Sequence, residues 1–188
     1  VFRFVCAKLK GWIDNGRQAF PVSVNFSTAS LMQPSFVEQL TAICSSYHIS
    51  PRYMQIEVTE RVHDMEGLDI KYLISKLRQA GFTVAIDDFG TEYANLALLS
   101  EVEFDVLKLD KSMIDNISSN PKTKAVVESI SEICTKLGID MVAEGIETEE
   151  QFSTLRSCGV GLAQGFLFSR PISTDEYEER YLNTTIDK

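Results

Sequence analysis

Polar side chains stand at the ends of six short apolar segments, and their types suit divalent-metal and phosphate chemistry. They are Asn25, Glu57, Asp87 with Asp88, Lys108, Glu144 and Gln164. Carboxylate and amide oxygens are hard ligands, which suit Mg²⁺ or Mn²⁺ better than Zn²⁺ or Cu²⁺. Such ions activate water and stabilise negative charge developing on a phosphoryl group. One Glu or Asn at such a position is usually a cap or turn residue, but the repetition at every segment favours a shared site.

The pair Asp87–Asp88 is the sharpest local feature, because it ends the apolar run Val84–Ile86. Buried acids are costly unless they are paired or metal-bound. Adjacent strand residues point to opposite faces, so both acids reach one centre only if the strand bends at its end. One acid would then bridge two cations. The alternative is that one acid caps the next turn, through Gly90 and Thr91.

Lys108 lies inside the apolar segment Val106–Leu109 and must therefore pair with an acid or face a polar cavity. It could orient an attacking water or balance phosphate charge, and the alternative is a structural ion pair. Glu144 is expected to bind metal or water, whereas the reading of Glu147 from its position is that it only caps a helix. Gln164 has no charge to titrate, so we expect it to contact substrate or water.

Amphipathic helices alternate with short apolar strands along the whole chain, the rhythm of repeated βαβ units. The expected strands are 21–27, 54–59, 82–88, 105–110, 139–144 and 162–168. The expected buried faces of the helices are Phe2, Cys6, Leu9 and Ile13; Phe36, Leu40, Ile43 and Tyr47; Leu73, Ile74 and Leu77; and Val126, Ile130, Ile133 and Leu137. Capping boxes are expected at Thr148 with Gln151 and at Ser173 with Glu176.

Two α/β architectures fit this rhythm, an open doubly wound sheet and a TIM-like (β/α) barrel. A barrel usually needs about 250 residues, and this chain has 188 and begins inside a helical pattern. A barrel that lacks its first one to two strands explains both facts, and we therefore expect residues 1–188 to form one domain, the C-terminal three quarters of a barrel. The ends of parallel strands carry the site in either architecture.

Composition excludes several other classes of protein. A net charge of −9 argues against unassisted binding to DNA. Four cysteines without a C-x-x-C pair indicate buried thiols in a reducing compartment, and two histidines leave little material for a zinc or Ser-His-Asp site. No apolar run reaches the roughly 20 residues that span a bilayer. We expect a cytoplasmic domain, whose parent protein could still be tethered to a membrane.

Six segments, in the same order, resemble the EAL domain family of cyclic-di-GMP phosphodiesterases. They are Val22–Ser27, Ile56–Glu60, Ile86–Thr91, Leu107–Ser112, Val142–Thr148 and Gln164–Pro171. Each segment alone is a weak signal, whereas the ordered set is very specific. The resemblance implies a β/α barrel with two divalent cations, Mg²⁺ or Mn²⁺, at its C-terminal face, and hydrolysis of one phosphodiester of cyclic-di-GMP to linear pGpG.

The resemblance also implies a role for each residue of the site. Asn25, Glu57 and Asp87 would hold one metal, and Asp87, Asp88 and Glu144 would serve the other. Lys108 would contact the nucleophilic water, supported by Glu144 and Glu147. Substrate contacts would come from Gln164, Phe166 and Pro171, and Glu60 would steady the loop after Asp88. In the family this loop couples metal binding to dimerisation, so a homodimer and fused sensory or cyclase domains are expected.

Two departures from the family pattern bear on activity. The Glu-Ala-Leu segment of the first strand, which supplies a metal ligand, is absent from these residues. Glu92 stands in the loop where the family usually has glycine, which adopts a positive φ more readily. Three hypotheses therefore stay open: an active phosphodiesterase in the intact parent, a non-catalytic module that binds cyclic-di-GMP or a protein, and another metal-dependent barrel enzyme.

Overall fold

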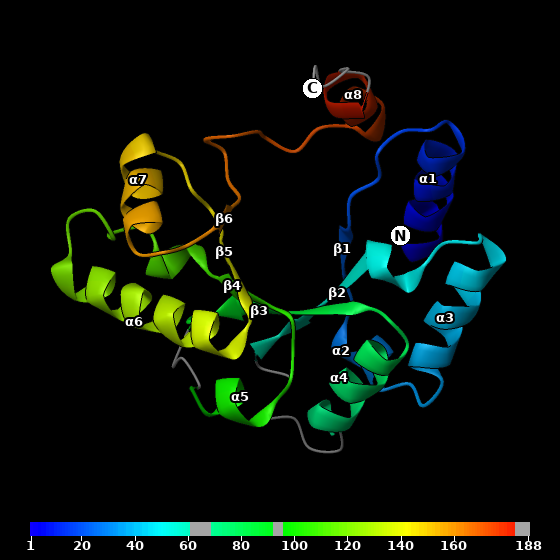
Figure 1. Ribbon diagram of the computed structural model, residues 1–188, viewed down its shortest axis with the longest axis horizontal. Helices are drawn as coiled ribbons and strands as arrows, with labels where there is room; N and C mark the ends of the chain where they lie inside the picture. Colours follow the sequence, from blue (N-terminus) through cyan, green and yellow to red (C-terminus); the bar gives the residue numbers. More distant parts are fainter. Residues whose placement is uncertain (61–68, 92–95, 183–188) are drawn as a thin grey trace.

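The computed structural model describes residues 1–60, 69–91 and 96–182, and it shows a curled parallel sheet with helices on its outer side (Figure 1). The strands are β1 (Val22–Asn25), β2 (Met54–Thr59), β3 (Thr83–Phe89), β4 (Val106–Leu109), β5 (Asp140–Ala143) and β6 (Leu162–Ala163). They lie in chain order and pair in parallel. The order is that of a β/α barrel, since a doubly wound sheet reverses its strand order. The predicted TIM-like architecture is confirmed as a partial, open barrel.

Helices lie before β1, between successive strands and after β6. They are α1 (Phe2–Asp14), α2 (Thr28–Leu31), α3 (Phe36–Ser46), α4 (Ile70–Gln79), α5 (Leu96–Glu101), α6 (Pro121–Leu137), α7 (Glu149–Ser157) and α8 (Thr174–Tyr177). Short 3₁₀ turns lie at η1 (Pro51–Tyr53) and η3 (Lys111–Met113), and a π-helical turn, η4 (Glu178–Leu182), follows α8. No helix in the described part of the chain is long and apolar enough to cross a membrane.

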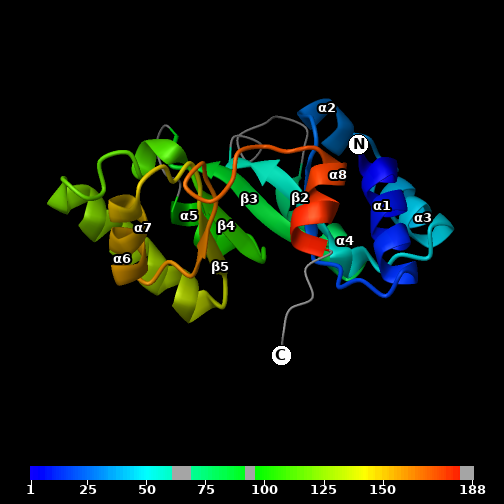
Figure 2. The same cartoon turned by 90° about the horizontal axis from the view of Figure 1, so that it is seen from above.

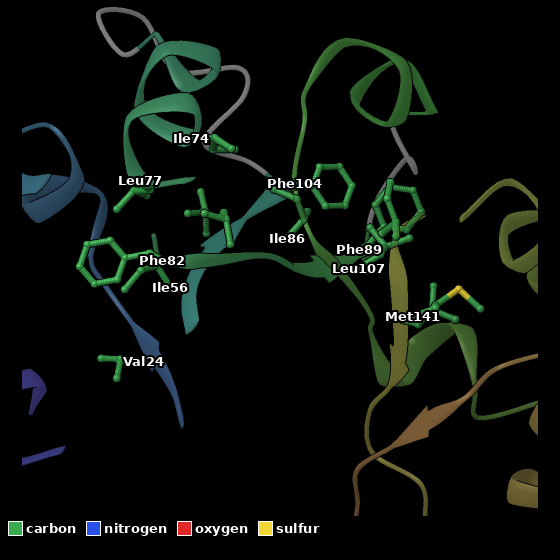
Figure 3. Close-up of a cluster of buried hydrophobic side chains, with 14 of the residues drawn as sticks. Val24, Ile56, Ile74, Leu77, Phe82, Ile86, Phe89, Phe104, Leu107 and Met141 are labelled. Carbon is green, nitrogen blue, oxygen red and sulfur yellow. The ribbon is translucent and has the colours of Figure 1, made fainter. Parts of the chain in front are cut away.

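The main core lies between the sheet and the helices. Figure 3 shows Val24, Ile56, Ile86 and Leu107 of successive strands, with Leu77 of α4 among the side chains of the same cluster. These strand residues are at most 3% exposed. Because side chains alternate along a strand, the residues next to them face the hollow of the curled sheet. That alternation frees the inner face for polar residues.

Several sequence predictions need correction in detail. The strand expected over 162–168 is only Leu162–Ala163, because the chain after it turns across the mouth of the sheet through hydrogen bonds with Ile146. Trp12 rather than Ile13 is buried on α1. On α6 the buried face is rotated by one residue to include Val127 and Cys134, and Val126 and Leu137 are about half exposed.

One of the two predicted capping boxes is confirmed in full, and so are the buried thiols. Thr148 and Gln151 form the reciprocal capping box, whereas at Ser173 only the hydroxyl contact to the Glu176 amide forms. All four cysteines are buried free thiols, as predicted.

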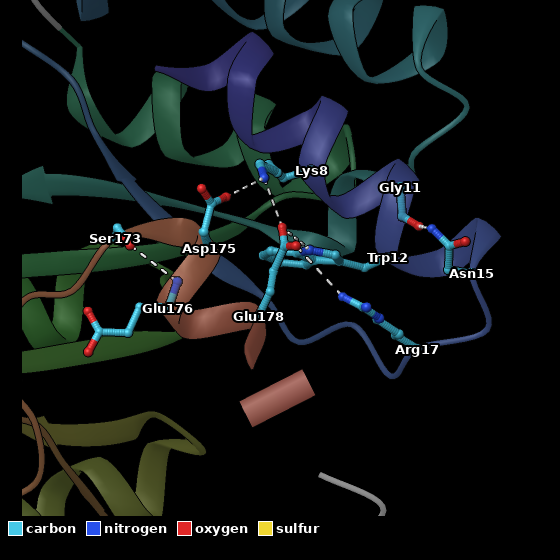
Figure 4. A network of polar contacts seen from close by, with 9 residues as sticks. All are labelled: Lys8, Gly11, Trp12, Asn15, Arg17, Ser173, Asp175, Glu176 and Glu178. Atoms are coloured by element: carbon cyan, nitrogen blue, oxygen red, sulfur yellow. Dashed lines mark hydrogen bonds and ion pairs between the residues drawn. The ribbon is translucent and has the colours of Figure 1, made fainter. Parts of the chain in front are cut away.

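The C-terminal segment crosses the open side of the sheet, from β6 to α1 (Figures 1 and 2). Oε1 of Glu178 accepts hydrogen bonds from Lys8 Nζ and Trp12 Nε1, both at 2.9 Å, and Arg17 adds an ion pair at 3.7 Å (Figure 4). The ring of Tyr177 packs against Trp12 with centroids 5.7 Å apart. This cluster fixes the segment that leads away from Gln164.

Candidate active site

Strand register places the predicted site residues on one face of the sheet. Asn25 pairs with Glu57, Glu57 pairs with Ala85 two residues before Asp87, and Lys108 pairs with Val142 two residues before Glu144. Since residues two apart share a face, all of these side chains face the inside of the curl. The outward neighbours of the same residues form the core, so the same alternation builds both the core and the site.

Lys108 stands at the centre of this inner cluster. Its Nζ lies 2.6 Å from Oε1 of Glu57, 2.9 Å from Oδ1 of Asp87 and 2.8 Å from Oε1 of Glu144. Glu57, Asp87 and Lys108 are each less than 8% exposed. A buried carboxylate is tolerated only when a cation or several donors compensate it. Three acids around one ammonium leave an excess of negative charge, which is the condition that favours an additional cation.

The charges of this cluster alter the proton affinities of its members. Burial alone would lower the pKa of Lys108, but the carboxylates of Glu144, Glu57 and Asp87 outweigh burial and raise it. Burial raises the pKa of Glu144, the Lys108 ammonium opposes that rise, and the carboxylates of Asp87 and Glu57 add to it. Lys108 is therefore a permanent cation at neutral pH, and the Glu144 carboxylate binds a proton more tightly than an ordinary glutamate, since its pKa is raised.

Asp87 and Asp88 lie at an irregular strand end. The register of β3 against β4 shifts between Ile86 and Phe89, and Asp88 has a φ of 58°. A positive φ is uncommon outside glycine, asparagine and aspartate, so the strand does bend where the sequence required a bend. The Asp87 side chain joins the Lys108 cluster, while Asp88 is exposed.

Glu60 lies against the loop that follows Asp88. Its Oε2 accepts a hydrogen bond of 3.1 Å from the Gly90 amide. Gly90 has a φ of 94°, and the side chain of Met113 fills the space where a Cβ atom would stand. Glu92, whose effect on this loop the sequence left open, lies outside the described residues.

The loop after β5 is held from two sides. The Ile146 amide donates to the Gln164 carbonyl and the Leu167 amide donates to the Ile146 carbonyl. On the other side Lys111 Nζ lies 2.5 Å from Oε1 of Glu147. Lys111 was missed by the sequence reasoning, although it follows Lys108 by three residues just as Glu147 follows Glu144.

The proposed substrate residues are more exposed and lie further along the chain. Gln164 lines a groove of about 470 Å³ between β1 and the C-terminal segment, together with Trp12, Ser23 and Tyr177 among others. Phe166 is 53% exposed, with the Arg170 guanidinium 4.8 Å from its ring centroid. Pro171 and Asn25 are exposed. None of these four side chains forms a hydrogen bond or ion pair with the Lys108 cluster within the described part of the chain.

The donor set fits a hard divalent cation, although the cation at its centre in this structure is an ammonium. Among residues 1–60, 69–91 and 96–182, no three acidic, histidine or cysteine side chains stand in a metal-holding arrangement. Lys108 Nζ lies where three of the carboxylates converge, and Glu144 Oε1 is buried with only this ion pair and no hydrogen bond. A buried carboxylate oxygen without a hydrogen bond is suited to serve as a metal ligand.

Comparison with known proteins identifies the family of the chain. The EAL domain model matches residues 1–171. The cyclic di-GMP phosphodiesterase NbdA of Pseudomonas aeruginosa is 33% identical over 180 residues, which cover 95% of this chain and 23% of NbdA. The chain spans about a fifth to a third of the curated relatives it matches.

Solved structures that resemble this chain include EAL domains. The EAL domain of Mycobacterium smegmatis DcpA superposes with a TM-score of 0.87 at 34% identity, covering 94% of this chain and 80% of that one. The manganese and cyclic-di-GMP complex of Klebsiella pneumoniae BlrP1 gives 0.80 at 35% identity, covering 90% and 42%. Because the EAL domain model matches residues 1–171, most of the chain, this chain belongs to the EAL domain family.

Proposed function

We propose that the intact protein hydrolyses one phosphodiester bond of cyclic-di-GMP to give pGpG in bacterial second-messenger signalling. The observation that carries the proposal is the convergence of Glu57, Asp87 and Glu144 on one buried lysine, on the inner face of an EAL-family sheet. Its relatives include named cyclic di-GMP phosphodiesterases, and BlrP1 was solved with manganese and the cyclic dinucleotide.

Two divalent cations, Mg²⁺ or Mn²⁺, would be held by this set of oxygen donors. Asn25, Glu57 and Asp87 would hold one, and Asp87, Asp88 and Glu144 the other. When bound, the ions lower the pKa of water and stabilise charge on the phosphoryl oxygens. Excess carboxylate around Lys108 supports this assignment, because a single ammonium does not balance the three acids.

The chain's own residues would handle the proton and the charge. Lys108 stays protonated, so it would donate a hydrogen bond to the attacking water and could not act as the base. Glu144, whose Oε1 lies 2.8 Å from the Lys108 ammonium, would accept the proton of that water. Glu147, 3 residues further on, would support the water or substrate from the rim.

The substrate would lie over the open mouth of the sheet. We assign Gln164 to a polar contact with it, and Phe166 and Pro171 to apolar contact with a guanine base. Exposed aromatic rings bind bases by stacking, a contribution of about 1–3 kcal/mol per base. Glu60 would hold the Gly90 loop in place for the metal-bound state.

We further propose that the protein is a cytoplasmic homodimer. Residues 1–188 would be one EAL-type phosphodiesterase domain, three quarters of a barrel of eight strands. Sensory or cyclase domains would accompany it in the parent chain, as expected for a chain that spans about 22% of the signalling protein YkoW. DNA is not among the expected partners, given the net charge of −9.

The decisive experiment is hydrolysis of cyclic-di-GMP by the purified protein, once with Mn²⁺ and once with EDTA. Metal-dependent appearance of pGpG is expected, and Asp87→Asn should abolish it. Asp140→Asn, at the exposed opposite end of β5, is the matched control and should retain activity. Turnover that persists in EDTA, or in Asp87→Asn, would refute the metal mechanism.

A binding module is the second candidate, favoured by one observation. Glu92 stands in the loop after Asp88, where the family usually has glycine, which adopts a positive φ more readily. Binding of cyclic-di-GMP without turnover, in a protein that supplies the remaining strands, would select this reading.

A further inference from the structure

One short turn, η3, contacts both of the loops that carry the acidic side chains. It follows β4 directly, beginning 3 residues after Lys108, and Asp110 caps it by accepting a hydrogen bond from the Ser112 amide at 2.8 Å. Backbone bonds anchor it on both sides, from the Asp110 amide to the Phe89 carbonyl and from the Glu144 amide to the Leu109 carbonyl. The turn therefore sits between the ends of β3 and β5.

On the β3 side, η3 packs through Met113. A Cβ atom built on Gly90 would lie 2.1 Å from Sδ and 2.7 Å from Cγ of Met113. The methionine thus lies flat against the backbone of the loop that begins at Asp87 and that Glu60 holds through the Gly90 amide.

On the β5 side, η3 packs through Lys111. A Cβ atom on Gly145 would lie 2.7 Å from Cβ and 2.8 Å from Cγ of Lys111. The ammonium of the same side chain pairs with Glu147 at 2.5 Å. Lys111 therefore covers the residue next to Glu144 with its stem and holds the end of the same loop with its charge.

We infer that η3 couples the Asp87–Gly90 loop to the Glu144–Glu147 loop, with Lys111 and Met113 as positioning residues for the acidic site. The inference deepens the proposed function and rests on it for its catalytic consequence alone. A 3-residue turn that is capped, tied to both strands and fitted against glycine on either side has little freedom to move one contact without the other.

The coupling predicts a response in the loop that a substituted residue does not touch. The amides to follow are Gly90, which donates to Glu60, and Ile146, which donates to the Gln164 carbonyl. In Lys111→Ala we expect hydrogen exchange of both amides to rise on the order of tenfold, because exchange reports local opening. Met113→Ala should raise both as well. These measurements need neither metal nor substrate.

The metal and kinetic readouts separate positioning from simple loss of structure. Lys111→Ala and Met113→Ala should each weaken Mn²⁺ binding, measured by calorimetry, by about tenfold, the usual size for loss of a residue that supports a ligand. Lys111→Met keeps the stem over Gly145 and loses only an exposed ion pair. Its affinity for Mn²⁺ should therefore stay within about fivefold of that of the parent protein. In hydrolysis assays kcat should fall more than KM changes.

Matched control variants separate the contact with η3 from loss of charge and from strain at glycine. Lys136→Met, on an exposed lysine of α6, controls for loss of positive charge. Gly145→Ala drives a Cβ into Lys111, whereas Gly138→Ala has the same φ of 71° with nothing within 4 Å, so the pair isolates the contact with η3. Gly145→Ala should raise the hydrogen exchange of the Gly90 amide, and Gly138→Ala should leave it unchanged.

Two results would overturn the inference. One is that each substitution loosens only the loop it touches, with additive effects in Lys111→Ala/Met113→Ala. The other is unchanged exchange of the Gly90 amide in both Lys111→Ala and Gly145→Ala. A protein that shows the cross-loop response but leaves cyclic-di-GMP uncut would instead retain the coupling and refute the proposed function.

Discussion

Nζ of Lys108 lies 2.6 Å from Oε1 of Glu57, and this contact joins β4 to β2 across the strand between them. Both side chains are nearly fully buried. The Lys108 ammonium, which also pairs with Asp87 and Glu144, compensates part of the negative charge on the inner face of the sheet. This arrangement also implies that stability and metal binding share the same groups.

Removing the Lys108 charge should therefore destabilise the metal-free protein. Lys108→Met leaves the buried carboxylates of Glu57 and Asp87 and the partly buried carboxylate of Glu144 without their cation, and the expected loss in the free energy of unfolding is about 3–5 kcal/mol. Urea denaturation in EDTA measures it. Mn²⁺ should raise the urea midpoint of the variant more than that of the parent protein. Lys136→Met, 77% exposed at its side chain, should change stability by less than about 0.5 kcal/mol.

Gly165→Ala should disturb the segment that carries Gln164. A Cβ atom there would lie 2.2 Å from the carbonyl oxygen of Ile146, and backbone cannot move aside as a flexible side chain can. Overpacking of this kind costs about 1–3 kcal/mol, which a thermal melt detects. Gly161→Ala has nothing within 4 Å and is the control. Equal melting temperatures for the two variants would contradict the close approach.

Thr148→Ala should weaken the start of α7. Its hydroxyl accepts from the Gln151 amide, and the Gln151 side chain in return accepts from the amides of Thr148 and Glu147. Loss of such a cap costs about 1 kcal/mol, measured by urea denaturation. Ser153→Ala, exposed on the same helix, should be close to neutral. A neutral Thr148→Ala would show that the Gln151 side chain alone holds the helix start.

Acid should loosen the C-terminal segment through Glu178. Hydrogen bonds from Lys8 and then Trp12 hold the pKa of Glu178 below its ordinary value of 4.5. A lowered pKa means that the stabilising contribution is present above 4.5 and is lost as pH falls through the folded value. Glu178→Gln should therefore lower the urea midpoint at pH 7 and have a smaller effect near pH 3. An effect of the same size at both pH values would exclude the ion-pair account.

How much the sequence predicted differs between the fold and the site. Alternating helices and strands, all six strands and the inner position of Glu57, Asp87 and Lys108 followed from the hydrophobic period and from the rule that parallel strands end at one edge. The extent of β6 did not, because Leu162–Phe168 is apolar apart from Gln164, and only the hydrogen bonds of Ile146 decide where the strand stops.

By itself, the sequence determined the family, the order of the elements and the chemical types gathered at the strand ends, since these depend on residue identity and local period. Only the tertiary structure decided which charges meet. It placed Lys108 among three acids, gave Asp88 its positive φ and set η3 between two glycine-bearing loops. Contacts such as Lys111 with Glu147 join residues 36 positions apart. Their geometry depends on sheet curvature and register, which no local pattern encodes.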